Sequence, residues 1–361
     1  MNKKVTIAVI DSGLTPDLLT DMIKIKKNYI VYKDTIVENS DVFDNNGHGT
    51  SCVYTIWKLC PSCDFVIIKV LNANNNSFPE LIINALEYLT TIDVDILNLS
   101  LSLYSDSYDQ YIKEIIEKLI RQNKIIITSA DNNKLKVNRL SLFDHVISIE
   151  GAPFITREKY GYNILKNQGI SSNIPIITPM SKDYRIFSGN SKATANFTGI
   201  LGNFLVNNPD REFILQQLYE ATSLKTWTLT EVRNVYKDLK SHMVSTINPK
   251  KYTKTHHMIY QIIRKYIAAN NENEVKNKSL FDIGINKNNC ISVLHALTRH
   301  LSQVVPLDSF NYLDLSTIYN IARCIITLFK LPRQMNLCNE RQSICCELRT
   351  RHILCLLYYS T

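Results

Sequence analysis

The first half of the chain alternates short apolar segments with segments of helical periodicity, and this alternation restricts the fold more than any other feature. Apolar residues at 112, 115, 116 and 119 repeat at helical spacing just before one such apolar segment. A helix between two strands returns the chain so that both strands run in the same direction, and such helices cover both faces of the parallel sheet. We therefore predict an α/β domain of three layers with a mostly parallel sheet. The predicted strands are residues 5–10, 65–71, 96–101, 125–129 and 146–149.

Polar residues stand where several of these strands end. Asp11 follows the first strand, Ser100 lies at the end of the third, and Ser129 ends the fourth. In open parallel sheets, ligands bind beyond the carboxyl ends of the strands. We therefore expect a binding site at this edge of the sheet.

Two further stretches carry residues suited to acyl transfer. His48 lies between two glycines, and Ser191 follows Gly189 at the start of an apolar, helix-compatible run. A serine at a helix start is most often only a cap, but the helix N-terminus also favours negative charge beside its oxygen. A serine hydroxyl needs a neighbouring base to act as a nucleophile. Aspartate, histidine and serine in this chain order are typical of one class of serine peptidases.

These stretches together resemble the subtilisin-like serine peptidases over about the first 224 residues. The resemblance implies a subtilisin-like catalytic domain at 1–224 in which Asp11, His48 and Ser191 form the catalytic triad. It also implies that Ser100, Leu101 and Ser102 pair with bound peptide. The motifs that carry it are Ile10–Gly13, Gly47–Thr50, Asp95–Ser102 and Gly189–Thr194.

The segment 127–132 is similar to the one that carries the oxyanion-hole asparagine in this family. The resemblance implies that Asn132 has this role, with Asn133 as the alternative one residue later. Asp131 stands where the family usually has glycine, and a carboxylate there would oppose an oxyanion. Ser102, Asn190 and Ala195 are further departures, in place of a glycine, a threonine and a proline. We interpret them as specialisation, and a catalytically weak, peptide-binding protein is the alternative.

The second half lacks strand patterns. We predict a helical connector at 225–255, a helical bundle at 256–330 and a cysteine-rich helical tail at 331–361. The spacing of apolar segments in the bundle resembles an acyl or peptidyl carrier domain, although any helical bundle has such stripes. At the position of the carrier serine stand Asn286 and Lys287, so we expect no phosphopantetheine arm. A docking surface for a biosynthetic partner protein would fit this bundle.

Composition favours a cytoplasmic protein. The apolar start of the 361-residue chain is interrupted by Asp11, so we expect no signal peptide, and we expect no propeptide before the first strand. Without an export signal, the nine cysteines are expected to be free thiols. The formal charge of +8 is spread out, so we expect no nucleic acid partner, and the absence of a long apolar run indicates no membrane span. We assign no cofactor and no metal. Cys60 and Cys63 are predicted to be separate thiols, Cys52 a buried one, and the cysteines of the tail to pack rather than bind zinc.

The sequence thus predicts a cytoplasmic serine endopeptidase that hydrolyses peptide or protein substrates. A role in the maturation of a precursor peptide would fit a partner-docking bundle.

Overall fold

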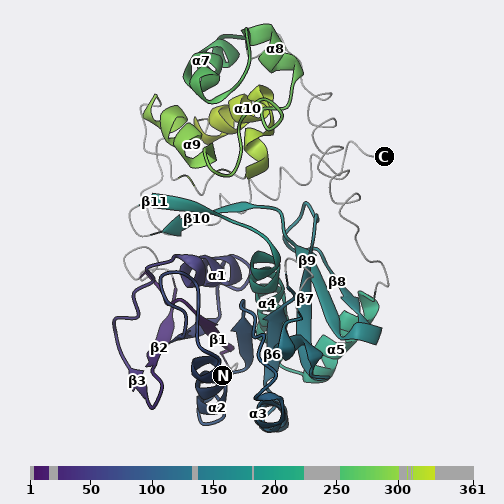
Figure 1. Cartoon of the computed structure of the whole chain (residues 1–361). Coiled ribbons are helices and arrows are strands. Elements are labelled where there is room, and N and C mark those ends of the chain that lie inside the picture. The colour runs from purple at the N-terminus through teal and green to yellow at the C-terminus, as the bar shows by residue number, and fades with distance from the viewer. Residues whose placement is uncertain are drawn as a thin grey trace. The chain divides into compact units, whose positions relative to one another are not determined.

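The computed structural model describes residues 4–15, 23–131, 137–180, 183–222, 253–300, 307, 310 and 312–329. The chain divides into two compact units, residues 1–232 and 233–361 (Figure 1). Each unit buries its own apolar side chains.

A sheet of nine strands forms the centre of the first unit. The seven inner strands run parallel to their neighbours, and only the two edge strands are antiparallel. All five predicted strands are present, although the second and third end two residues earlier than expected, at Lys69 and Leu99. In order across the sheet, the strands are β3 (Ile36–Glu38), β2 (Ile25–Val31), β4 (Asp64–Lys69), β1 (Thr6–Asp11), β5 (Ile96–Leu99), β6 (Ile125–Ser129), β7 (Val146–Ala152), β9 (Gln168–Ser172) and β8 (Tyr160–Asn163).

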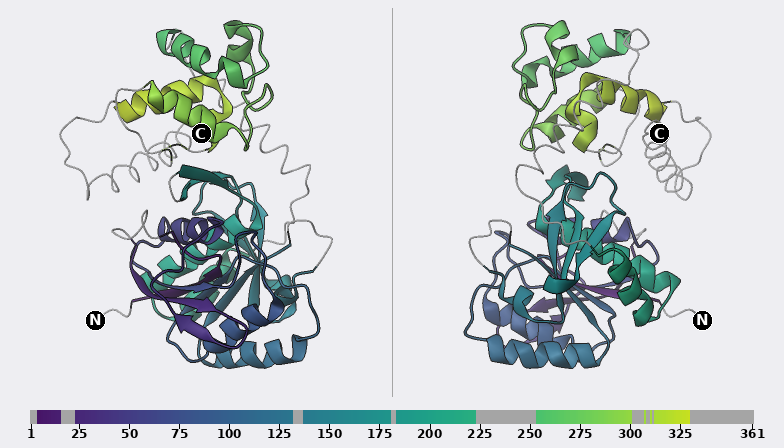
Figure 2. Two further views of the ribbon diagram at one scale, coloured as in Figure 1. Left: turned by 60° about the vertical axis from the view of Figure 1, so that its left-hand side comes forward. Right: turned by 90° about the vertical axis from the view of Figure 1, so that its right-hand side faces the viewer.

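Helices cover both faces of this sheet, which makes three layers (Figure 2). Ile7 and Val9 of β1 point to one face and pack with α1 (His48–Trp57), α4 (Asn190–Asn207) and α5 (Arg211–Glu220). Ala8 and Ile10 point to the other face and pack with α2 (Pro79–Tyr88) and α3 (Asp109–Arg121). The predicted α/β architecture is therefore confirmed, since β1 is apolar on both sides as a strand between two helical layers must be.

Helices α1 and α4 pack closely on the same face of the sheet. A β-carbon on Gly199 of α4 would lie 2.8 Å from the Leu59 Cβ atom and 2.9 Å from the Ile56 carbonyl oxygen. Only glycine allows α4 to approach the end of α1 at this distance. The two helices begin near His48 and Ser191, so this contact helps to set the distance between those residues.

A two-stranded hairpin, β10 (Ile176–Met180) and β11 (Asp183–Phe187), lies against the start of α1. The hydroxyls of Thr178 and Ser51 are 2.8 Å apart, and Arg185 donates from Nη1 to the Asn46 carbonyl at 2.7 Å. The hairpin leads directly into α4 and therefore joins the beginnings of the two helices.

The described residues of the second unit form helices and no strand. Ile259, Leu294 and Ile321 are among the fully buried side chains, and the Leu280 amide donates to the Ser316 carbonyl at 2.8 Å. The segments are α7 (Thr253–Ile263), η5 (Arg264–Tyr266), α8 (Glu272–Asn277), α9 (Cys290–Arg299), η7 (Tyr312–Ser316) and α10 (Ile318–Phe329).

Much of the predicted connector and the whole predicted tail lie outside the described residues, as do the cysteines and His352 of that tail. Among the helices that the structure describes, none is both long and apolar enough to cross a membrane.

Candidate active site

Asp11 is the last residue of the central strand β1, and its side chain is fully buried. Its Oδ1 atom accepts the Ser12 amide at 2.8 Å and lies 2.8 Å from Nδ1 of His48. The chain turns away immediately afterwards at Gly13, which has a φ of +113°. A carboxylate thus stands at the carboxyl edge of the sheet, where the sequence predicted it.

His48 is the first residue of α1, and the loop before it is fixed by the buried Asp44. The Asp44 Oδ1 atom accepts the Gly47 amide at 2.7 Å, and Oδ2 accepts the amide and the hydroxyl of Thr50 at 2.8 and 2.7 Å. Gly47 has a φ of +82°, a conformation that glycine adopts without strain. Asp44 therefore holds the first turn of α1, and with it His48.

The Asp11 carboxylate determines how the imidazole can act. Because a carboxylate only accepts hydrogen bonds, the neutral His48 ring carries its proton on Nδ1 and leaves Nε2 as an acceptor. The Phe187 ring packs edge-on against the imidazole, with ring centroids 5.4 Å apart. The ring is thus oriented from two sides, with a basic nitrogen available.

Ser191 is the second residue of the long helix α4, which begins directly after Gly189, a residue with a φ of +83°. Its Oγ atom donates to the Ser100 carbonyl at 3.1 Å, and the Ser100 hydroxyl donates to the Ser191 carbonyl at 3.2 Å. Within the described residues, Ser191 makes no hydrogen bond to His48. The structure therefore joins Asp11 to His48 and Ser191 to Ser100, with the serine side chain turned toward the end of β5.

The predicted substrate-binding segment, Ser100 to Ser102, continues beyond the end of β5. Asn138 braces it: its Nδ2 atom donates to the Leu101 carbonyl at 3.1 Å, and its Oδ1 atom accepts the Leu103 amide at 3.0 Å. Asn138 also donates to the Ser129 carbonyl at the end of β6 at 2.8 Å. Sequence reasoning missed Asn138, because a single asparagine before a short helical turn resembles ordinary loop composition.

The predicted oxyanion-hole residue Asn132 and its alternative Asn133 lie outside the described residues. Asp131, the departure next to them, has its carboxylate bonded by the Tyr104 hydroxyl.

Cys52 is buried one turn after His48, as predicted. Its Sγ atom lies 3.6 Å from Asp11 Oδ2 and 3.9 Å from His48 Nδ1. Burial, followed by the negative charge of Asp11, raises the pKa of this thiol well above its ordinary value. Asp11, His48 and Cys52 place three ligand atoms within 4.8 Å of one another, so they are the described group best suited to a metal ion. The protonated thiol and the bond between Asp11 and His48 oppose such a use.

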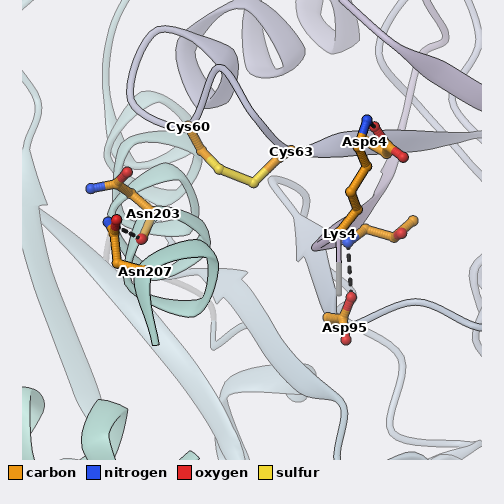
Figure 3. The surroundings of a disulfide bond; sticks show 8 residues. Lys4, Cys60, Cys63, Asp64, Asp95, Asn203 and Asn207 are labelled. Atoms are coloured by element: carbon orange, nitrogen blue, oxygen red, sulfur yellow. Dashed lines mark hydrogen bonds and ion pairs between the residues drawn. A yellow bond between two sulfur atoms is a disulfide. The ribbon is translucent and has the colours of Figure 1, made fainter. Parts of the chain in front are cut away.

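The prediction of separate thiols at Cys60 and Cys63 is wrong: the two residues form a disulfide (Figure 3). They lie in the turn between α1 and β4, where the Cys63 amide donates to the Cys60 carbonyl and the Cα atoms are 5.6 Å apart, a separation that a disulfide spans. Gly202 of α4 packs on both sulfur atoms, since a β-carbon there would lie 3.1 and 3.3 Å from them. The disulfide thus supports the contact between α1 and α4.

Comparison with known proteins adds an independent result. The sequence pattern of the subtilase family, peptidase S8, matches residues 2–254. The chain is 25% identical over 246 residues to the major intracellular serine protease of Bacillus subtilis (strain 168), across 61% of this chain and 73% of that protein. It is 25% identical over 209 residues to the minor extracellular protease Epr of the same organism, across 53% of this chain and only 30% of that protein. The solved structure of Sphericase aligns with 58% of this chain and 79% of its own, at 18% identity and a TM-score of 0.48.

Proposed function

The chain belongs to the subtilase family and is a serine-type hydrolase, and on this basis we propose that it is an endopeptidase that acts through Asp11, His48 and Ser191. The observation that carries the proposal is the 2.8 Å contact between Asp11 Oδ1 and His48 Nδ1 at the carboxyl edge of the sheet. This contact leaves His48 Nε2 as the base that a serine nucleophile requires.

In the proposed reaction, the Ser191 side chain rotates from the Ser100 carbonyl toward His48. His48 Nε2 takes the hydroxyl proton as Oγ attacks the scissile carbonyl, and Asp11 stabilises the imidazolium that forms. His48 then gives the proton to the leaving amine, and water hydrolyses the acyl-enzyme by the same steps. The N-terminus of α4 and the Asn132 amide would stabilise the oxyanion.

The substrate we propose is a peptide in extended conformation that pairs with Ser100, Leu101 and Ser102. A backbone edge beyond the end of a strand suits pairing with an extended peptide. We further propose maturation of a precursor peptide in the cytoplasm, with the helical second unit as a carrier-like docking surface for a biosynthetic partner. The name of the intracellular relative supports this location, while that of the extracellular relative and the disulfide argue against it.

One observation favours a second candidate, a catalytically weak peptide-binding protein. Ser191 donates to Ser100, and its side chain must rotate before it can reach the base. In that candidate the bond between Ser191 and Ser100 persists when peptide binds.

A fluorophosphonate probe distinguishes the two candidates. The Ser191 oxygen bonds to phosphorus, fluoride leaves, and the hydroxyl proton passes to His48, so only an activated serine is labelled. We expect labelling of the full chain and none of Ser191→Ala. Labelling should fall by at least about 10³-fold in His48→Ala, because His48 supplies the base. Absence of labelling in the unmodified protein would leave peptide binding as the remaining function.

A further inference from the structure

The residues on either side of Ser191, Asn190 and Lys192, are both buried polar side chains at the start of α4. Burying a polar group is costly unless it is hydrogen-bonded, and burying a lysine is more so. We therefore expect each of these two side chains to make hydrogen bonds that offset the cost of its burial.

Asn190 bonds to two adjacent strands of the sheet at once. Its Nδ2 atom donates to the carbonyl of Ala130, just after β6, at 2.9 Å. Its Oδ1 atom accepts the amide of Gly151 in β7, also at 2.9 Å. A β-carbon on Gly151 would lie 3.0 Å from that Oδ1 atom and 2.6 Å from the Asn173 Cβ atom, so the glycine keeps room for the contact. An amide suits this place because it presents a donor and an acceptor in one plane.

Lys192 reaches a third strand. Its side chain is only 1% exposed, and its Nζ atom donates to the carbonyl of Ser172, the last residue of β9, at 2.8 Å. Burial, together with the nearby Arg157, lowers the pKa of Lys192 to about 7, and Glu158 opposes this shift. Burial disfavours the charged form of this lysine, so the hydrogen bond from Nζ to the Ser172 carbonyl is the interaction that offsets the cost of burial.

The three consecutive side chains therefore attach one turn of helix to a row of neighbouring strand ends. Ser191 contacts the residue after β5, Asn190 contacts β6 and β7, and Lys192 contacts β9. The Ser191 hydroxyl thus lies between the two attachments.

We propose that Asn190 and Lys192 are positioning residues that hold Ser191 for attack by attaching the first turn of α4 to the carboxyl ends of β6, β7 and β9. This inference rests on the proposed serine-hydrolase function. It assigns these residues no direct contact with substrate. Their contribution is the position of Oγ and of the helix N-terminus, and a displacement of about 1 Å at a reacting atom can cost roughly 100-fold in rate.

The test is the rate of fluorophosphonate labelling per folded molecule, separated into a maximal labelling rate and a half-saturating probe concentration. Asn190→Asp has nearly the same shape but loses the donor to Ala130, and Lys192→Met keeps the apolar stem but loses Nζ. We expect each variant to lower the maximal rate by about tenfold or more, with the half-saturating concentration unchanged. A purely structural role would lower only the folded fraction, which near-UV circular dichroism measures.

Lys124 offers a matched control. It is also a buried lysine whose Nζ atom donates to backbone carbonyls, those of Leu89 and Ile92, but it precedes β6 at the opposite edge of the sheet. Lys124→Met should destabilise the fold and leave the maximal rate within about twofold. Equal maximal rates in all variants, or an equal loss in Lys124→Met, would overturn the inference. If Lys192→Met does not fold, Asn190→Asp decides the question. Failure to label the unmodified protein would instead reject the proposed function.

Discussion

A β-carbon on Gly49 would lie 2.3 Å from the carbonyl oxygen of Gly13. The turn that follows Asp11 and the first turn of α1 are therefore in direct backbone contact. The Gly49 amide adds a hydrogen bond to the Ser12 hydroxyl at 2.9 Å. The distance between Asp11 and His48 depends on this contact.

Gly49→Ala should therefore separate Asp11 from His48. Backbone cannot yield as a flexible side chain does, so we expect a loss of about 1–3 kcal/mol in unfolding free energy and roughly 100-fold in labelling rate. Chemical denaturation and probe labelling measure both effects. Normal labelling in Gly49→Ala would show that the contact does not set the distance.

Asp44→Ala should disorder the start of α1. The substitution removes every acceptor for the Gly47 and Thr50 amides in a buried place, which costs about 1–3 kcal/mol. Because His48 is held by this turn, labelling per folded molecule should fall as well. Asp210, which accepts the Glu212 amide at the exposed start of α5, provides the comparison. Asp210→Ala should cost about 1 kcal/mol and leave labelling unchanged. Equal labelling by the two variants would contradict this role of Asp44.

The lowered pKa of Lys192 should make the stability of the protein increase with pH. Its pKa is about 7 in the folded protein, below the ordinary 10.5, so between these values the unfolded chain binds a proton that the folded chain does not. The contribution of Lys192 to stability therefore rises with pH, by about 1.4 kcal/mol per pH unit. Near and below pH 7 the burial penalty is fully present.

Urea unfolding at about pH 7.5 and 9.5 should show this as a difference between the unmodified protein and Lys192→Met that changes by roughly 2–3 kcal/mol. Both proteins share all other titrating groups, so the contributions of those groups to stability cancel in the difference. Parallel pH profiles would mean that Lys192 titrates as an ordinary exposed lysine.

The disulfide between Cys60 and Cys63 should be detectable in the protein purified without reductant. The peptide that contains both residues should resist alkylation after denaturation and accept two alkyl groups after reduction. Replacing both residues with alanine should cost about 2 kcal/mol, because the closed loop is short. Complete alkylation without reductant would mean that Cys60 and Cys63 are free thiols, as the sequence suggested.

The centre of the fold was predictable because its sequence patterns are strong. The roles of single polar residues were not predictable. The apolar run before Asp11 predicted a buried strand that ends at this carboxylate, and the strand is present. The edge strands β3 and β8 are only three and four residues long, too short for a periodic signal.

The supporting residues of the site carry no such pattern. Asn138 and Lys192 act through backbone atoms that are distant in sequence, so their partners exist only in the folded chain. The spacing of Cys60 and Cys63 likewise did not reveal a turn that brings the two sulfur atoms together.

Asn138 leads to a prediction that separates peptide recognition from chemistry. Its Nδ2 atom donates to the Leu101 carbonyl, the Thr128 hydroxyl and the Ser129 carbonyl, at 3.1, 3.0 and 2.8 Å. Asn138→Asp keeps the shape but replaces this donor with an acceptor, which should loosen the segment from Ser100 to Ser102. We expect KM for an extended peptide substrate to rise by about tenfold, since a lost buried bond to the segment costs 1–2 kcal/mol.

A small fluorophosphonate that does not pair with this segment should label Asn138→Asp at nearly the normal rate. Among the hydrogen bonds of the described residues, Asn138 has none with Ser191 or His48, so the reacting groups should keep their positions. The control is Asn84→Asp, because Asn84 also donates from its side-chain amide to a backbone carbonyl, that of Lys33, but at an exposed place. It should change neither quantity. A fall in the labelling rate of Asn138→Asp without a rise in KM would mean that Asn138 supports the nucleophile instead of the substrate, because the end of β5 also receives the Ser191 hydroxyl.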